Sequence, residues 1–174
     1  WVSLAIPVTA YAELEQKWTR LLDIELSNFD KFLGVPHYSV DLDGYEKGDG
    51  KSGKPIGLNK DPLNVFSTIE TEDDVVLKIS GEVFGGLSTK QEYQNYHLRA
   101  EFKWGENKFE PRLNLLRDNG ILYHCTGEYG AFWNVWMRAP EMQVQETDMG
   151  DFYALAGVAM DIRSRKSVRA DARG

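Results

Sequence analysis

The sequence predicts an all-β fold, a sandwich or jelly roll of antiparallel sheets. Short segments alternate polar and apolar side chains with the period of two that half-buried strands show. Gly, Asp and Pro punctuate the intervals between these segments. The strands do not alternate with helical segments, so a doubly wound parallel sheet is not expected. At 174 residues, the chain fits one domain with a single core.

The elements are expected in the following order. Residues 13–22 have the apolar spacing of a short amphipathic helix. Residues 35–63 are rich in Gly, Pro, Asp and Lys and predict a long surface loop. Six strands are predicted after this loop, and the segment NYHLRAEFKWG at residues 95–105 alternates most strictly. The six strands cover residues 74–81, 95–105, 120–125, 131–137, 141–146 and 152–162.

The start of the chain resembles the end of a secretory signal. WVSLAIPVTAYA is a short apolar run that closes on an A-x-A pattern, although no initiator Met or basic segment precedes it. A first helix or strand of the domain is the alternative. We interpret residues 1–12 as a signal-peptide remnant and residues 13–174 as one β-sandwich domain, and we expect a periplasmic or secreted protein. No apolar stretch approaches the ~20 residues of a membrane span.

Charge and composition limit the class of partner. The chain has 27 acidic and 20 basic residues, a net charge of -7 that repels nucleic-acid phosphates, so nucleic acid is excluded as a partner. Cys125 is the only cysteine, so no internal disulfide can form. Trp, Tyr and Phe are plentiful, and their faces suit both a β core and the stacking of sugar rings.

The segment EMQVQE is the strand of greatest chemical interest. In a regular strand its alternate residues lie ~6.6 Å apart and share a face. One face takes Glu141, Gln143 and Gln145, and the other takes Met142, Val144 and Glu146. We expect the apolar pair to point to the core and the polar face to bind sugar hydroxyls. A solvated outer face is the alternative for this strand alone.

Ordinary glycoside hydrolysis needs two carboxyl groups at a defined separation. A regular strand offers only Glu141 on the polar face. Glu146 joins that face only if a bulge follows Gln145, and Asp148 or Asp151 only if the turn swings them inward. The usual two-acid mechanism is therefore disfavoured.

Three fragments in this order resemble the 3-keto-disaccharide hydrolase domain family. They are GGLSTKQEYQNYHLRAEFKWG, RLNLLRDNGILYHC and EMQVQETDMGDFYAL, and WTRLLDIELSNFDKFLG resembles the opening of that family. The resemblance covers residues 18–162 and implies a concanavalin A-like jelly roll that acts on glycosides oxidised to a ketone at C3. Family members usually continue through further strands, with a Trp-Asn segment and a His-x-x-Asn-Gly stretch, and neither follows Ile162. C-terminal strands are therefore expected to be lacking.

A C3 ketone changes what the site must supply. It acidifies the hydrogen on C2, so one general base and a stabilised enolate suffice to expel the group on C1 by elimination, and water can then add. Glu141 is the candidate base. Lys90 matches the Gly-x-Leu-x-Thr-Lys motif of the family and can polarise a keto oxygen, while a solvated turn lysine is an equal alternative.

Further candidates flank the central strand. His124 can act as a base near neutral pH, and in a strand its ring faces away from that of Tyr123. Arg117 precedes the same strand. Trp133 and Trp136 lie three residues apart, which in a strand places them on opposite faces, one for the core and one to stack a sugar.

No metal or cofactor is predicted. The three histidines lack a paired metal-ligand spacing, which argues against zinc. The acidic loop DLDGYEKGDG can collect calcium as a minor alternative, but it fails the EF-hand pattern.

The sequence thus favours an enzyme that cleaves or hydrates 3-keto-glycosides such as 3-keto-disaccharides, by elimination or hydrolysis. The alternatives are a non-catalytic carbohydrate-binding module and a structural interaction domain. The predicted catalytic residues are Glu141, His124 and Lys90, and the predicted substrate-binding residues are Gln143, Gln145, Glu146, Asp148, Arg117, Trp133 and Trp136.

Overall fold

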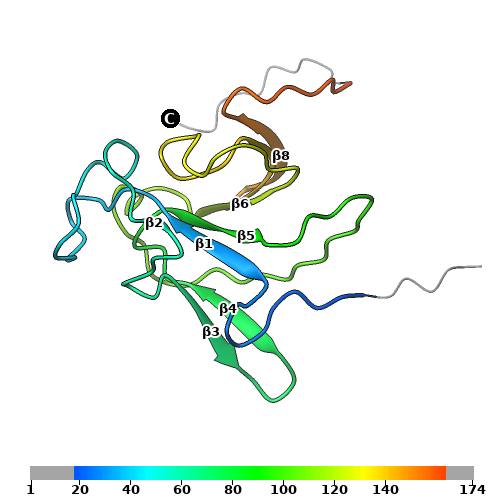
Figure 1. Ribbon diagram of the computed structural model, residues 1–174, viewed down its shortest axis with the longest axis horizontal. Coiled ribbons are helices and arrows are strands. Elements are labelled where there is room, and N and C mark those ends of the chain that lie inside the picture. The colour runs from blue at the N-terminus through cyan, green and yellow to red at the C-terminus, as the bar shows by residue number, and fades with distance from the viewer. Residues whose placement is uncertain (1–17, 164–174) are drawn as a thin grey trace, which may run out of the picture.

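A computed structural model describes residues 18–163 of the chain. Within these residues it contains eight β-strands and no helix (Figure 1). The strands are β1 (Phe29–Leu33), β2 (Gly57–Leu58), β3 (Phe66–Glu70), β4 (Val75–Ile79), β5 (Gly85–Thr89), β6 (Asp118–Leu122), β7 (Ala139–Gln145) and β8 (Asp148–Leu155).

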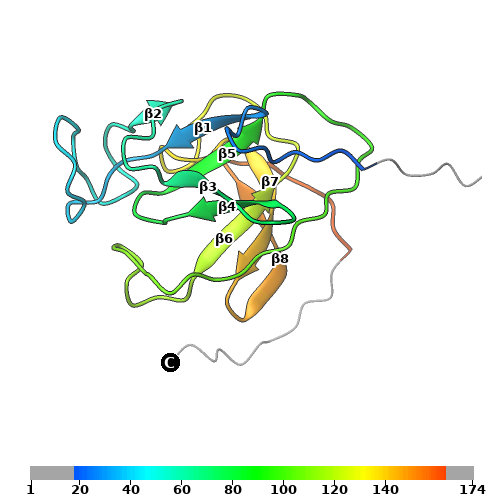
Figure 2. The same ribbon diagram turned by 90° about the horizontal axis from the view of Figure 1, so that it is seen from below.

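The strands form three small antiparallel sheets. The first has the order β2-β1-β5, the second is the β3-β4 hairpin, and the third has the order β6-β7-β8. In both views the third sheet lies beside the first with its strands running in a different direction (Figures 1 and 2). The predicted all-β fold class is confirmed, and the arrangement is consistent with a sandwich.

The main core lies between the first sheet and the β3-β4 hairpin. Leu33 of β1 and Phe66 of β3 are buried in one apolar cluster. Gly85 of β5 permits this packing, because an added Cβ there would lie 2.6 Å from Leu33 Cδ2 and 2.7 Å from the Phe32 carbonyl oxygen. A side chain at this position would force β1 and β5 apart.

The connection between β6 and β7 attaches the third sheet to the first. Val135 in this connection is buried against Gly34, where an added Cβ would lie 2.6 Å from Val135 Cγ2. The indole Nε1 of Trp136 donates a hydrogen bond of 3.1 Å to the Gly85 carbonyl. The third sheet is therefore fixed to the core by apolar packing and a hydrogen bond.

Four predicted strands are present, two of them displaced. The strands predicted at 74–81 and 141–146 correspond to β4 and β7, and those at 120–125 and 152–162 correspond to β6 and β8, which begin earlier and end earlier. Left-handed backbone conformations follow both displaced strands: His124 has a φ of 50° and Ala156 a φ of 53°. A strand cannot continue through such a residue.

Two predicted strands are wrong. Residues 95–105 contain no paired strand, and nearly all of them are exposed. Residues 131–137 form turns instead, since Trp133 and Asn134 both have a φ of 55° and the Phe132 carbonyl accepts hydrogen bonds from the Val135 and Trp136 amides. The alternation of polar and apolar residues did not predict the left-handed backbone conformation of these two residues.

The remaining expectations concern the first third of the chain. The helix predicted at residues 13–22 is wrong where the structure describes it, because residues 18–22 are not helical, and its other residues lie outside the described part. The predicted signal remnant at residues 1–12 also lies outside it. The long loop at residues 35–63 exists, but it contains β2 and buries Val35 and Ile56.

Candidate active site

The third sheet presents one polar face built from all three of its strands. In β7, Glu141 pairs with Leu122, Gln143 with Gly120 and Gln145 with Asp118 of β6. On the other side Glu141 pairs with Tyr153 and Gln145 with Asp148 of β8. Directly paired residues share a face in an antiparallel sheet. The structure therefore places Glu141, Gln143 and Gln145 on one face as the sequence predicts. It also brings Asp148 onto this face, where the residue was expected only if the turn swung it inward.

A row of hydrogen bonds crosses this face. Gln143 Nε2 donates to Asp118 Oδ1 at 2.7 Å and to Gln145 Oε1 at 3.2 Å. Gln145 Nε2 donates in turn to Asp148 Oδ2 at 3.2 Å. An ionised carboxylate only accepts hydrogen bonds, so Asp118 fixes which end of the Gln143 amide faces it. The Gln143 Oε1 takes part in neither of its two hydrogen bonds.

The burial of the two faces differs from the expectation. We expected the apolar side chains to point to the core, yet Gln143 is only 6% exposed while Met142 is 40% exposed. The ladder is irregular between Met142 and Val144, where a bulge on the β7-β8 pair disturbs the alternation of contacts. Val144 is buried as predicted, whereas the expectation for Met142 is wrong.

The Glu141 carboxylate lies across Gly120. A Cβ at Gly120 would sit 1.8 Å from Glu141 Oε1 and 2.6 Å from Glu141 Cδ. No side chain other than that of glycine fits beneath the carboxylate in this position. The glutamate is therefore folded onto β6 and partly removed from water.

The pKa of Glu141 is raised from 4.5 to about 7. Burial is the larger cause, because it disfavours the charged form, and the negative charge of Asp118 is the second. A carboxylate with a pKa near the working pH can both take and return a proton. Glu141 therefore holds its proton to a higher pH than an ordinary glutamate does.

Glu146 and Arg117 pair with each other away from this face. Glu146 Oε1 lies 2.6 Å from Arg117 Nη1, and Glu146 Oε2 accepts a hydrogen bond of 2.7 Å from the Arg117 backbone amide. These hydrogen bonds hold the pKa of Glu146 below its usual range. Because the bulge lies before Gln145 rather than after it, Glu146 is not turned onto the face of Glu141.

The structure does not bring Lys90 or His124 into the row of hydrogen bonds. Lys90 follows β5 in a different sheet, and its Nζ donates to the Ser27 carbonyl at 2.7 Å. His124 lies beyond the end of β6, where its exposed ring contacts those of Tyr96 and Tyr123 at centroid distances of 6.2 and 5.7 Å. The expected opposite orientation of Tyr123 and His124 is wrong because the strand has already ended.

Trp133 and Trp136 belong to one aromatic cluster, not to opposite faces of a strand. Their ring centroids lie 5.8 Å apart. Phe132 stacks on Trp133 at 4.6 Å, and the Lys51 ammonium lies 3.6 Å from the Trp133 ring centroid. These contacts compete with a sugar for the ring of Trp133, although this side chain is 45% exposed.

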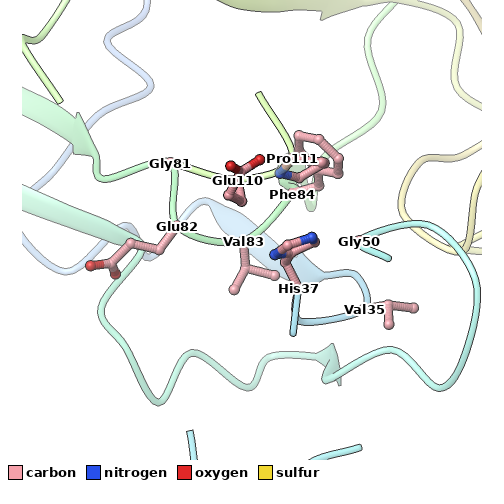
Figure 3. A pocket seen from close by; sticks show the side chains of 9 residues that line it. All are labelled: Val35, His37, Gly50, Gly81, Glu82, Val83, Phe84, Glu110 and Pro111. Carbon is pink, nitrogen blue, oxygen red and sulfur yellow. The ribbon is translucent and has the colours of Figure 1, made fainter. Parts of the chain in front are cut away.

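Neither the acidic loop nor a small hollow elsewhere offers an open binding site. Asp49 accepts hydrogen bonds from the Lys51 and Ser52 amides, so its carboxylate closes a turn of the loop. The hollow shown in Figure 3 is lined by residues that include His37 and Glu110, and it is too small to hold a water molecule.

Among the described residues, no three His, Cys, Asp or Glu side chains gather as metal ligands. Nor does the described part contain a helix able to span a membrane.

A comparison with known protein families shows which family the chain belongs to. The family described as the 3-keto-alpha-glucoside-1,2-lyase-like domain matches residues 25–172. The chain belongs to this family. The predicted resemblance is therefore confirmed, and the family description indicates a carbohydrate-related function. No curated protein and no solved structure shows significant similarity to the chain.

Three residues of the polar face were not predicted. Asp118 and Gly120 lie on β6 opposite Gln145 and Gln143, and Arg112 Nη2 lies 3.0 Å from Asp118 Oδ2. If the strand predicted at 120–125 had been predicted to begin two residues earlier, its alternation would have placed Asp118 on the same face as Gly120. Arg112 lies in the turn before β6, so no alternation of polar and apolar residues could have predicted its position.

Proposed function

We propose that this domain cleaves 3-keto-glycosides by elimination, with Glu141 as the general base. The observation that carries the proposal is the position of Glu141, whose pKa is raised to about 7, over Gly120 on the sheet face that also carries Gln143 and Gln145. Membership of the lyase-like family supports a substrate with a ketone at C3. A purely binding module would not need a carboxylate of such raised pKa.

The reaction can be written with all atoms and electrons balanced. The Glu141 carboxylate takes the C2 proton, and the electrons of the C2–H bond form an enolate with the C3 carbonyl. The enolate then re-forms the carbonyl as the C1–C2 double bond forms and the C1–O bond breaks. The departing oxygen takes a proton from protonated Glu141 or water. The products are an unsaturated 3-keto sugar and the released alcohol, and addition of water to the double bond gives the free 3-keto sugar.

The amides bind the substrate in this proposal. Gln143 uses both hydrogens of its Nε2 on Asp118 and Gln145, so its Oε1 accepts from a sugar hydroxyl. Gln145 directs one Nε2 hydrogen to Asp148, and its second can donate to a sugar oxygen. Roles for Lys90 and His124 would require these side chains to leave their present contacts.

Asp118 and Asp148 share this face with Glu141, which raises the question of ordinary hydrolysis. Asp148 accepts a hydrogen bond from Gln145. Asp118 is engaged by Gln143 and by Arg112, at 2.7 and 3.0 Å, so it is not poised to act as a nucleophile or a second acid. The elimination route needs only Glu141. It also predicts that a glycoside without the ketone is not a substrate.

The test compares a 3-keto-disaccharide with its unoxidised parent. Wild-type protein is expected to release monosaccharide from the keto compound only, and Glu141→Gln is expected to lose this activity while keeping its fold. Glu72→Gln, which alters an exposed glutamate at the β3-β4 turn, is the matched control. Cleavage of the parent, or full activity in Glu141→Gln, would refute the proposal, and binding of the keto compound without turnover would favour a carbohydrate-binding module.

A further inference from the structure

Asp118 lies on the same face of the sheet as Glu141 and has two polar partners of its own. Its Oδ1 accepts the hydrogen bond from Gln143 Nε2 at 2.7 Å, and its Oδ2 lies 3.0 Å from Arg112 Nη2. Arg112 Nη2 also donates to the Leu116 carbonyl at 2.9 Å, so the guanidinium is tied to the backbone that precedes β6. Asp118 is thus held from two sides, by the turn before its own strand and by the neighbouring strand.

Gly120 sets the second constraint on Glu141. It lies two residues after Asp118 on the same face of β6, directly beneath the Glu141 carboxylate. The distance of 1.8 Å from a built Cβ to Glu141 Oε1 shows that any larger residue would displace the carboxylate. On the face of Glu141, Asp118 therefore supplies a negative charge and Gly120 supplies the space in which the carboxylate lies.

We propose that Asp118 is a positioning residue of the site. It orients the Gln143 amide, and it places a fixed negative charge against the Glu141 carboxylate, which lies over the space that Gly120 leaves open. This inference rests on the proposed function of Glu141 as the base. Asp118 touches the amide and the arginine but not the reacting atoms of a substrate, so its role is exerted through Gln143 and Glu141.

Among the charged and titratable groups near Glu141, Asp118 is the one whose replacement tests the inference. The titratable and charged groups on the packed elements are Asp118 of β6, Arg112 of the preceding turn, and Tyr153, Asp148 and Asp151 of β8. Of these, Asp118 is the one whose charge raises the pKa of Glu141. Burial raises the pKa of Asp118 as well, and Arg112 and Gln143 oppose that rise. Both partners therefore favour the charged form of Asp118.

The experiment measures the pKa of Glu141 by NMR of protein labelled with ¹³C at the glutamate carboxyl groups, with Glu141→Gln to assign the signal. In Asp118→Asn the Glu141 pKa is expected to fall from about 7 toward 4.5, without reaching 4.5 because burial remains. Asp118→Glu restores the charge and is expected to restore part of the rise. Asp73→Asn removes an exposed carboxylate from the β3-β4 turn and is expected to change nothing.

A second pair of variants tests the space under the carboxylate. Gly120→Ala is expected to move Glu141 and change its pKa, whereas Gly86→Ala in β5 is the matched control, because a Cβ there would meet only Trp136 Cδ1 at 3.7 Å. If Asp118→Asn does not fold, Asp118→Ser is a second neutral variant with a smaller side chain.

The outcomes separate this inference from the proposed function. An unchanged Glu141 pKa in folded Asp118→Asn or Asp118→Ser overturns the role of Asp118, whether or not the protein turns over 3-keto-glycosides. A wild-type protein without such turnover overturns the proposed function. A lowered Glu141 pKa, together with a pH profile of kcat/KM displaced to lower pH and partly restored by Asp118→Glu, supports both.

Discussion

Replacing Glu141 by glutamine is expected to stabilise the protein at alkaline pH, because the native fold disfavours the charged form of this side chain. Its folded pKa of about 7 lies above the ordinary value of 4.5. A group whose pKa is raised on folding contributes its full stability below the unfolded pKa and loses it as the pH rises through the folded pKa. Wild-type protein should therefore lose stability between pH 4.5 and 7 relative to Glu141→Gln.

The size of this effect follows from the same pKa. A rise from 4.5 to about 7, at about 1.4 kcal/mol per pH unit, corresponds to about 3 kcal/mol. Partial contact of the side chain with water lowers this figure, so we expect Glu141→Gln to raise the free energy of unfolding by about 2 to 3 kcal/mol at pH 8. At pH 4 the glutamate is protonated and the two proteins should be equally stable.

Urea unfolding of both proteins from pH 4 to pH 9 measures this difference directly. Glu72→Gln, at an exposed position, is expected to follow the wild type across the whole range. A difference between Glu141→Gln and wild type that stays constant with pH would refute the electrostatic reasoning. So would a variant that is less stable at pH 8.

Four further predictions concern other parts of the account. The kcat/KM for a 3-keto-glycoside should rise with pH through about 7, because only ionised Glu141 can take the C2 proton, and a flat profile would count against this role. Glu146→Gln should lower the Tm at pH 7 without changing kcat; since the pKa of Glu146 is depressed, its stabilisation should disappear as the pH falls below 4.5, and a pH-independent loss would contradict the ion pair. Trp136→Phe should cost about 1 kcal/mol of stability through its lost indole hydrogen bond, measured by urea unfolding against wild type, and no loss would show that the bond is dispensable. Hydrogen exchange should be fast at residues 96–104, which are in no strand, and slow in β7, which pairs on both sides; strong protection of residues 96–104 would show that they are paired in solution.

The fold class and the central strand could be predicted because both depend on local patterns. Period-two alternation identified β4 and β7, and the register then placed Glu141, Gln143 and Gln145 on one face as expected. The same pattern failed at residues 95–105, because alternation describes a surface that fits a sheet but does not supply a neighbouring strand. It also failed at Trp133 and Asn134, whose left-handed conformations belong to a turn that an alternating pattern does not indicate.

The chemistry of the site could be predicted only in part. The sequence identified Glu141 as a lone carboxylate among amides, yet its raised pKa depends on a neighbour from another strand, Asp118, and on the space at Gly120. Cross-strand neighbours follow from register, which the sequence does not specify by itself. The burial of Gln143 was missed for the same reason, because its partners come from β6.

The most direct test of proton abstraction by Glu141 follows the C2 hydrogen of a 3-keto-glycoside by NMR in deuterated water during cleavage. The account predicts that each cleavage event by wild-type protein removes the original C2 hydrogen, and that Glu141→Gln neither removes this hydrogen nor breaks the C1–O bond. Release of the C1 substituent with the original hydrogen still on C2 would contradict elimination and leave Glu141 without its proposed role.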